Sequence, residues 1–301
     1  MPELPEVQTT VDGINKKVLL RTFVDVWSDW EKMIKKPKDF REFKKLIIGK
    51  KIIKAWRRAK NVIINLSDGY SLLIHQKMTG HLLFGKWFRQ ERNLTVARKT
   101  IWTPEDKKSP LNDPYNRFLH IIFFLDNGKM LALSDSRKFA KVELWKTNEL
   151  LNSTEFKKIG PEPLDKNFNF KKFKKALENK RGKIKAVLMN PEIIAGIGNI
   201  YANEALWYAK IHPQKDVANL SQKELKSLYQ SVIKVLKRGV ELGGESFSDY
   251  RNIEGGKGNF DDERRVYKRE GQECRRCKTK IKRIKFNGRS SFFCPICQIL
   301  K

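Results

Sequence analysis

The sequence predicts an α+β fold of two domains, an N-terminal antiparallel β-sandwich led by a helix and a C-terminal helical domain that ends in a cysteine hairpin. Three observations support this fold class. Strand-like segments flank glycine turns in the first half of the chain, and apolar residues recur at helical spacing from Phe170 onward. All four cysteines lie between positions 274 and 297. A chain of 301 residues is long enough to bury two separate cores.

The first six residues, from Met1 to Glu6, predict an ordered helix start. Pro2 and Pro5 suit the first turn of a helix, and the two glutamates place negative charge at the positive end of the helix dipole. One apolar helical face follows, formed by Val7, Val11, Ile14 and Val18. If Met1 is removed, the new terminus is the secondary amine of Pro2. An α-amino group titrates at roughly pH 7.7–8.0, so part of it is an unprotonated nucleophile at neutral pH. The alternative reading of these residues alone is a plain capped helix start.

Residues 1–148 are predicted to form the β-sandwich. Two hairpins are expected, one over residues 62–74 around Ser67-Asp68-Gly69 and one over residues 119–133 around Asp126-Asn127-Gly128. Several such hairpins indicate an antiparallel sandwich. Residues 86–116 are polar and proline-bearing and match no regular pattern, so they are predicted to be an insertion or long loop.

Residues 149–164 are predicted to be a linker and residues 165–260 a helical domain. The strongest helix start is Ser221-Gln222-Lys223-Glu224, a capping box, and Gly243-Gly244 is expected to end that helix. The glycine-rich, polar residues 244–259 are predicted to form a mobile loop. A plain surface connection fits their local sequence equally well.

A glycine-bearing turn, Ala195-Gly196-Ile197-Gly198-Asn199, precedes an apolar helix. Backbone N–H groups at such a turn can face an anion, and Asn199 adds a side-chain donor. Because a basic helix is expected from Lys180 to Met189, we predict a helix–turn–helix that binds phosphate. The simpler alternative is an ordinary turn.

Two cysteine pairs, Cys274-x-x-Cys277 and Cys294-x-x-Cys297, are separated by sixteen residues. This spacing predicts one tetrahedral Zn²⁺ bound by four thiolates, with no open position, in a structural finger over residues 261–301. The alternative is four free core thiols. Six cations lie between the pairs and make the hairpin suited to phosphates: Lys278, Lys280, Lys282, Arg283, Lys285 and Arg289.

The formal charge is +29, from 63 Lys and Arg against 34 Asp and Glu, and the excess is spread along the chain. A folded protein with this charge is expected to bind a polyanion. A membrane surface is the competing partner, but no apolar run reaches the roughly 18 residues of a spanning helix. The acidic, proline-bearing start does not match a signal peptide, and no cysteine remains for disulfides elsewhere. These features favour the cytoplasm.

A third stretch, Asp135-Ser136-Arg137-Lys138-Phe139, places two cations beside an aromatic residue after a strand. Such a loop suits entry into a duplex, where the phenyl ring wedges into the base stack and the arginine takes the place of a vacated base. Met78 is a candidate second wedge. The alternative for both Phe139 and Met78 is a place in the core.

Together these stretches resemble the formamidopyrimidine-DNA glycosylase family of base-excision repair enzymes, whose fold combines a β-sandwich, a helix-two-turn-helix and a zinc finger. The matching stretches occur in the same order as in the family and cover nearly the whole chain. Leu4 favours this branch over the endonuclease VIII-like relatives. It is carried by the four cysteines and by residues 1–7, 58–60, 75–80, 135–139, 160–164, 195–206 and 211–213.

The resemblance implies a bifunctional DNA glycosylase and abasic-site lyase for oxidised purines. Pro2 would attack C1′ of the damaged nucleotide and form a Schiff base, while Glu3 would protonate the sugar ring oxygen. Successive β- and δ-eliminations would then cut the strand, with Lys60 and Arg289 gripping the phosphates at the lesion. Glu6 would support the terminus.

The resemblance also implies the contacts with DNA. Asn199 matches the phosphate ligand of the helix-two-turn-helix and Arg181 a basic contact. The residues that fill the gap left by the flipped nucleotide would be Met78, Arg137 and Phe139, and His75 and Lys138 are further expected contacts. The partner would be duplex DNA with oxidised bases or abasic sites, bound by a monomer associated with the nucleoid. Zinc would hold Arg289 on its finger.

Several positions depart from the family pattern. The usual Asp-Pro-Arg-Arg-Phe-Gly loop lacks its proline and glycine here, which predicts a looser loop, and Lys138 lacks a bidentate fork. Phe118 occupies the place of a family histidine. Residues from Ser248 onward differ from familiar lesion loops and leave the preferred base open. Two alternatives therefore remain, a glycosylase for oxidised pyrimidines and a non-catalytic protein that binds damaged DNA.

Overall fold

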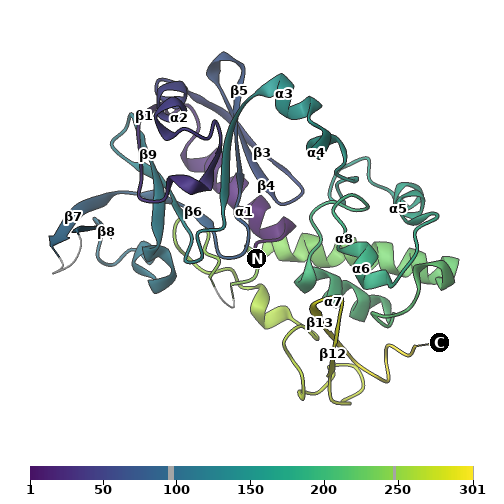
Figure 1. Cartoon of the computed structure of the whole chain (residues 1–301). Coiled ribbons are helices and arrows are strands. Elements are labelled where there is room, and N and C mark those ends of the chain that lie inside the picture. Colours follow the sequence, from purple (N-terminus) through teal and green to yellow (C-terminus); the bar gives the residue numbers. More distant parts are fainter. Residues whose placement is uncertain (94–97, 247–248, 301) are drawn as a thin grey trace. The chain divides into compact units, whose positions relative to one another are not determined.

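The computed structural model describes residues 1–93, 98–246 and 249–300 (Figure 1). The chain divides into two compact units. The first comprises residues 1–2, 6–153 and 243–258, and the second comprises residues 3–5, 154–242 and those from 259 onward. Residues 243–258 thus group with the first unit, although they lie within the predicted helical domain over residues 165–260. Among the described residues, no helix is both long and apolar enough to cross a membrane.

The first unit is built mainly of strands. Its elements are α1 (Leu4–Lys17, whose first two residues belong to the second unit), β1 (Phe23–Ser28), β2 (Ile34–Lys36), α2 (Phe40–Ile47), β3 (Ile52–Arg58), β4 (Asn61–Leu66), β5 (Tyr70–His75), β6 (His81–Gly85), β7 (Trp87–Asn93), β8 (Arg98–Pro104), β9 (Leu119–Leu125), β10 (Met130–Ser134), β11 (Lys141–Lys146) and α3 (Thr147–Asn152).

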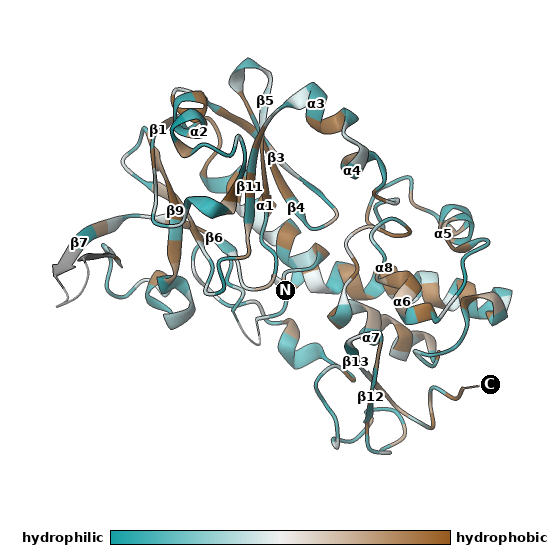
Figure 2. Ribbon diagram, viewed as in Figure 1, coloured by the Kyte–Doolittle hydropathy of each residue, from teal (hydrophilic) through white to brown (hydrophobic). Residues whose placement is uncertain are grey.

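Two sheets form the predicted sandwich, with strand orders β1-β9-β10-β6 and β2-β11-β5-β4-β3. Both predicted hairpins are confirmed, because β4 pairs antiparallel with β5 and β9 antiparallel with β10. One core joins the two sheets and α1, and the apolar face of α1 is buried as predicted, with Val7 and Ile14 both 0% exposed. Figure 2 shows the strongly hydrophobic residues along β9.

Residues 86–116 were predicted to be an insertion or long loop, and the loop alternative is wrong because the described part of this stretch has regular structure. Strands β7 and β8 make an antiparallel hairpin, followed by short 3-10 helices at Pro110–Asn112 and Pro114–Arg117 (Figure 1). Trp102 packs edge-on against Trp27 of β1 at 5.2 Å between ring centroids, and Trp87 is buried. Trp87 and Trp102, which stand among charged residues, supply apolar contacts that no periodic pattern in the sequence predicted.

The second unit is mainly helical. Its elements are α4 (Thr154–Lys157), α5 (Phe170–Leu177), α6 (Ile184–Leu188), α7 (Asn199–Ala209), α8 (Gln222–Glu241), β12 (Lys282–Phe286) and β13 (Arg289–Phe293). The capping box at Ser221 and Glu224 is present, and α8 ends just before Gly243, whose φ is +73°. The predicted basic helix over 180–189 is shorter than expected, because Gly182 adopts a φ of +102° and α6 begins only at Ile184.

Candidate active site and metal centre

The side chain of Glu3, the residue just before α1, lies at the N-terminal end of α7 in the second unit. Glu3 is 2% exposed, and its carboxylate accepts hydrogen bonds from the backbone N–H groups of Ile200, at 2.9 Å, and Tyr201, at 3.4 Å. Leu4 N–H donates to the carbonyl of Gly196 at 3.0 Å. The first turn of α7, which follows the glycine turn, therefore binds a carboxylate of the chain itself, and the predicted phosphate binding stays a prediction.

Gly196 shows why this turn needs glycine. Its φ is +81°, and a Cβ there would lie 2.8 Å from Cβ of Leu4. A side chain would displace the segment that carries Glu3. Asn199 begins α7 directly beside this carboxylate-binding turn, and Arg181 is exposed one residue before Gly182.

Lys185 is a residue that the sequence analysis missed. It is 2% exposed, and its Nζ donates to the carbonyl of Ser290 at 2.8 Å and to Oγ of Ser291 at 2.6 Å. Burial lowers the pKa of Lys185 to about 7; Glu3 opposes this shift and Arg289 adds to it. Lys185 and Arg289 both line a small cavity of about 60 Å³. A lysine inside the apolar run from Ile184 to Leu188 was the available signal.

Glu6 binds a segment of the first unit that follows α8 in the chain. Its Oε1 accepts from the N–H of Glu245 at 2.7 Å, and its carbonyl accepts from the hydroxyl of Tyr250 at 2.9 Å. Gly244 has a φ of +85°, and a Cβ there would meet Glu6 at 2.8 Å. Within the predicted mobile loop over residues 244–259, Glu6 therefore binds Glu245 and Tyr250, while residues 247 and 248 lie outside the described part of the chain.

A group of cations surrounds His75 at the end of β5. Burial lowers the pKa of His75 to about 3, and Lys77, Lys60 and Lys141 act in the same direction. The N–H of Lys77 donates to Nδ1 of His75 at 3.0 Å. His75 is therefore neutral at pH 7, with its proton on Nε2, which makes this nitrogen a hydrogen-bond donor. Lys60 is half-buried in the turn that joins β3 to β4.

Both candidate wedge residues are exposed, Phe139 at 54% and Met78 at 41%. The alternative that they pack in the core is therefore wrong. The guanidinium carbon of Arg137 lies 4.6 Å from the ring centroid of Phe139. Lys138 has a φ of +57°, and its Nζ lies 4.2 Å from the ring centroid of Trp30.

Asp135 organises this loop without the family's proline and glycine. Its fully buried carboxylate accepts from the N–H groups of Phe139 and Ala140, each at 2.7 Å, and of Arg137 at 3.2 Å. It also accepts from the hydroxyl of Thr79, which is on the turn that carries Met78. One carboxylate thus links the segments that carry the two exposed apolar side chains.

His120, the histidine that remains near Phe118, is on β9, with Nδ1 2.7 Å from Oδ1 of Asp29. It is 8% exposed.

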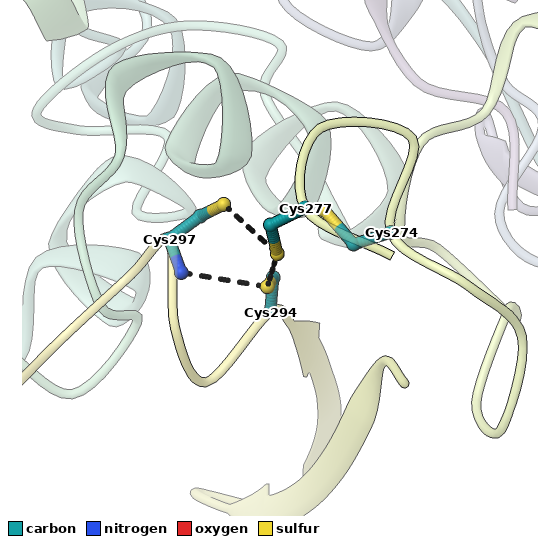
Figure 3. Close-up of side chains that lie close together, drawn as sticks. All are labelled: Cys274, Cys277, Cys294 and Cys297. Carbon is teal, nitrogen blue, oxygen red and sulfur yellow. Dashed lines mark hydrogen bonds between the residues drawn. The ribbon is translucent and has the colours of Figure 1, made fainter. Parts of the chain in front are cut away.

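The four cysteines meet at one point in the second unit. Their sulfur atoms all lie within 4.8 Å of one another, and Figure 3 shows them converging from two loops. Four thiolates around Zn²⁺, with Zn–S bonds of roughly 2.3 Å, place sulfurs roughly 3.8 Å apart, so the donor set fits this ion. The Cys277 and Cys294 sulfurs are 3.4 Å apart. A structural zinc is therefore supported by both the donor chemistry and the spacing.

The finger presents Arg289 at the end of a tight hairpin. Asn287 and Gly288 have φ values of +49° and +69°, as in a type I′ turn, and Phe286 pairs with Arg289 across it. The finger is attached to α7, because the N–H of Phe292 donates to Oδ1 of Asn203 at 2.8 Å. Oxygens of buried Glu204 accept three further backbone N–H bonds from residues 265–267.

Comparison with known proteins gives matches over most of the chain. Residues 1–142 match the formamidopyrimidine-DNA glycosylase N-terminal domain, residues 159–251 the formamidopyrimidine-DNA glycosylase H2TH domain, and residues 271–299 the zinc finger found in FPG and IleRS. The chain is 37% identical to proteins named formamidopyrimidine-DNA glycosylase from Desulforamulus reducens and Chloroflexus aggregans. These matches cover 100% of this chain and 100% and 99% of the relatives.

Solved structures agree. The chain matches a Lactococcus lactis FPG variant in complex with DNA containing Fapy-dG, with a TM-score of 0.83, 32% identity, and 99% and 100% of the two chains covered. It matches L. lactis Fpg bound to abasic-site DNA with a TM-score of 0.83 at 31% identity, with 99% of each chain covered. A MutM complex with DNA containing carbocyclic 8-oxo-G gives 0.82 at 32% identity, with 99% and 100% covered. The chain belongs to the formamidopyrimidine-DNA glycosylase family of base-excision repair enzymes.

Proposed function

We propose that this enzyme excises oxidised purines, 8-oxoguanine and formamidopyrimidines, through the N-terminal amine of Pro2 and then cuts the strand. The observation that carries the proposal is the N-terminal segment itself. Pro2 is buried, and Glu3 is fixed by two backbone N–H groups at the start of α7. A nucleophile beside a firmly oriented carboxylate is the arrangement that covalent catalysis requires. The similar structures named above hold DNA with Fapy-dG, an abasic site or an 8-oxo-G analogue.

In the proposed reaction the nitrogen lone pair of Pro2 forms a bond to C1′. The bond from C1′ to the base breaks, and the base leaves with the electron pair and takes up a proton. Glu3 takes up the proton that the Pro2 nitrogen releases on attack and gives it to the ring oxygen as the sugar opens, which leaves an iminium at C1′. Removal of the C2′ proton then expels the 3′ phosphate. Removal of the C4′ proton expels the 5′ phosphate.

The remaining residues are proposed to hold the DNA. Lys60 and Arg289 grip the phosphates at the lesion, and Asn199 and Arg181 bind the flanking backbone. Neutral His75 donates a hydrogen bond to the DNA from Nε2, and Lys138 adds a positive charge. Met78, Arg137 and Phe139 fill the space of the flipped nucleotide, which the exposure of both apolar side chains supports. Zinc, held by the four cysteines, stabilises the hairpin that carries Arg289.

Borohydride trapping tests this proposal. We expect sodium borohydride to join the protein covalently to a duplex with 8-oxoguanine or an abasic site, with the adduct at Pro2 in intact-mass and peptide mass spectra. A protein whose Met1 has been removed and which gives no adduct overturns the proposal. Tight binding of abasic DNA without cutting identifies the non-catalytic alternative. Faster excision of thymine glycol than of 8-oxoguanine in matched duplexes identifies the oxidised-pyrimidine alternative.

The monomeric state, the association with the nucleoid and the domain boundaries at residues 148, 164 and 260 stay predictions. Sedimentation with and without duplex tests the first, imaging of a tagged chain the second, and limited proteolysis the third.

A further inference from the structure

The 3-10 helices after strand β8 are joined to the segment after residue 248 by an ion pair between partly exposed Asp113 and buried Arg251. Arg251 is 1% exposed, and its Nε lies 3.0 Å from Oδ2 of Asp113. The guanidinium carbon also lies 4.7 Å from the ring centroid of Tyr115. Removal of the Asp113 charge leaves a buried guanidinium without this partner, whereas the Asp113 side chain is 19% exposed, so the pair couples the two segments mainly through Arg251.

Asp113 is itself fixed in place. Its Oδ1 accepts from the N–H of Tyr115 at 3.0 Å and so caps the 3-10 helix Pro114–Arg117. Burial acts to raise the pKa of Asp113, but the hydrogen bonds from Arg251 and from the N–H of Tyr115, together with the positive charge of Arg251, outweigh it and the pKa is lowered. Asp113 is therefore ionised at neutral pH, and one carboxylate serves both the cap and the ion pair.

Asn116 makes a second connection between the same two segments. Its Nδ2 donates to the carbonyl of Gly255 at 3.2 Å, and its Oδ1 accepts from Nε2 of His81 at 2.9 Å. Gly255 has a φ of +86°, and a Cβ there would lie 2.8 Å from Nδ2 of Asn116. Between these two connections Ile253 is in the sandwich core, where its carbonyl accepts from Phe84 N–H at 2.7 Å.

Hydrogen bonds through Tyr250 connect the ion pair to Glu6. Nη1 of Arg251 donates to the carbonyl of Tyr250 at 2.8 Å, and the Tyr250 hydroxyl donates to the carbonyl of Glu6 at 2.9 Å. Glu6 lies in the first turn of α1, four residues after Pro2. An unbroken series of short contacts within the first unit therefore runs from Asp113 to the start of the N-terminal helix.

We propose that Asp113 and Arg251 are positioning residues that fix Tyr250 and Glu6 and thereby orient the N-terminal amine for attack. This inference rests on the proposed function of Pro2. It also assigns a role to the insertion between β8 and β9, whose 3-10 helices supply one partner of the pair. Misplacement of a reacting group by about 1 Å can slow a reaction about 100-fold, so the effect is expected on rate.

Single-turnover borohydride trapping on an abasic duplex tests the proposal, because it gives a rate constant and a final amplitude separately. We expect Asp113→Asn and Arg251→Met to trap to wild-type amplitude with rate constants about 10–100-fold lower, and with a Kd for duplex within about twofold of wild type. Arg251→Lys, which keeps the charge, should recover part of the rate. Assays are run well below the melting temperature of each variant.

Glu254→Gln is the matched control. It breaks the Lys17–Glu254 pair in the same segment, which is 2.9 Å long but has side chains 37% and 61% exposed. An exposed pair contributes little, so its rate should stay near wild type. A reduced amplitude with a wild-type rate constant in Asp113→Asn and Arg251→Met shows a structural role only and overturns the proposal. Equal rates and amplitudes in all variants also overturn it, while failure of the wild type to trap refutes the function of Pro2 and this inference together.

Discussion

Replacing Glu3 by glutamine separates a structural role of this carboxylate from a chemical one. Glutamine has nearly the same shape but offers one acceptor oxygen, and it carries no charge at the start of α7. The variant therefore loses one of two hydrogen bonds, at 2.9 and 3.4 Å, together with the favourable interaction with the helix dipole. These losses amount to about 1–3 kcal/mol of unfolding free energy.

That loss is too small to explain a large fall in activity. Domains have an unfolding free energy of about 5–15 kcal/mol, so even the lowest value reduced by 3 kcal/mol leaves about 97% of the molecules folded. A general acid contributes about 100- to 10,000-fold to a rate. We therefore expect Glu3→Gln to lower the single-turnover rate of 8-oxoguanine excision at least 100-fold, with a melting temperature only a few degrees lower.

The assay measures release of the base and strand cutting under enzyme excess, with removal of Met1 verified by intact mass. Glu224→Gln is the control, because Glu224 also accepts a backbone N–H at a helix start, from Ser221 at 2.9 Å, and pairs with Lys215. It should lose comparable stability and keep wild-type activity. Excision by Glu3→Gln within tenfold of wild type would falsify the assignment of Glu3 as the proton donor.

Three further predictions concern metal, salt and pH. Chelation of zinc, or Cys294→Ser, should unfold the finger and abolish strand cutting while the sandwich stays folded, as judged by circular dichroism and cleavage assays; full activity after metal removal contradicts the structural role. Lys60→Ala should reduce the slope of log Kd against log salt by about one phosphate contact, roughly 0.9, and an unchanged slope removes Lys60 from the interface. The pKa of His75 is lowered from 6.5 to about 3 in the folded protein, so between pH 6.5 and pH 3 His75 binds a proton only in the unfolded chain. The stability that neutral His75 contributes to the fold is therefore complete above pH 6.5 and falls as the pH decreases towards 3. Urea unfolding of His75→Gln should show a weaker loss of stability between pH 7 and pH 5, and an identical pH dependence in both proteins contradicts the burial of a neutral imidazole.

The structural elements that the sequence predicted well depend on residues close to one another in the chain. The capping box of α8 needs only Ser221 and Glu224, and each hairpin needs a glycine turn between two apolar segments. The hairpin of β7 and β8 was missed, because its anchor at Trp102 depends on Trp27, 75 positions earlier in the chain. Neither tryptophan stands in a regular apolar pattern, so local periodicity carried no signal.

By itself the sequence determined the two-part architecture, the four-cysteine centre and the candidate nucleophile, because these follow from periodicity, spacing and residue type within short windows. Only the tertiary structure decided the electrostatic state of the site. Three features show this: the lowered pKa of Lys185, the two N–H groups that bind Glu3, and the pairing of Asp113 with Arg251. Each depends on contacts between residues that are distant in sequence. Burial and hydrogen bonding, which set charge and orientation, exist only after such residues have been brought together.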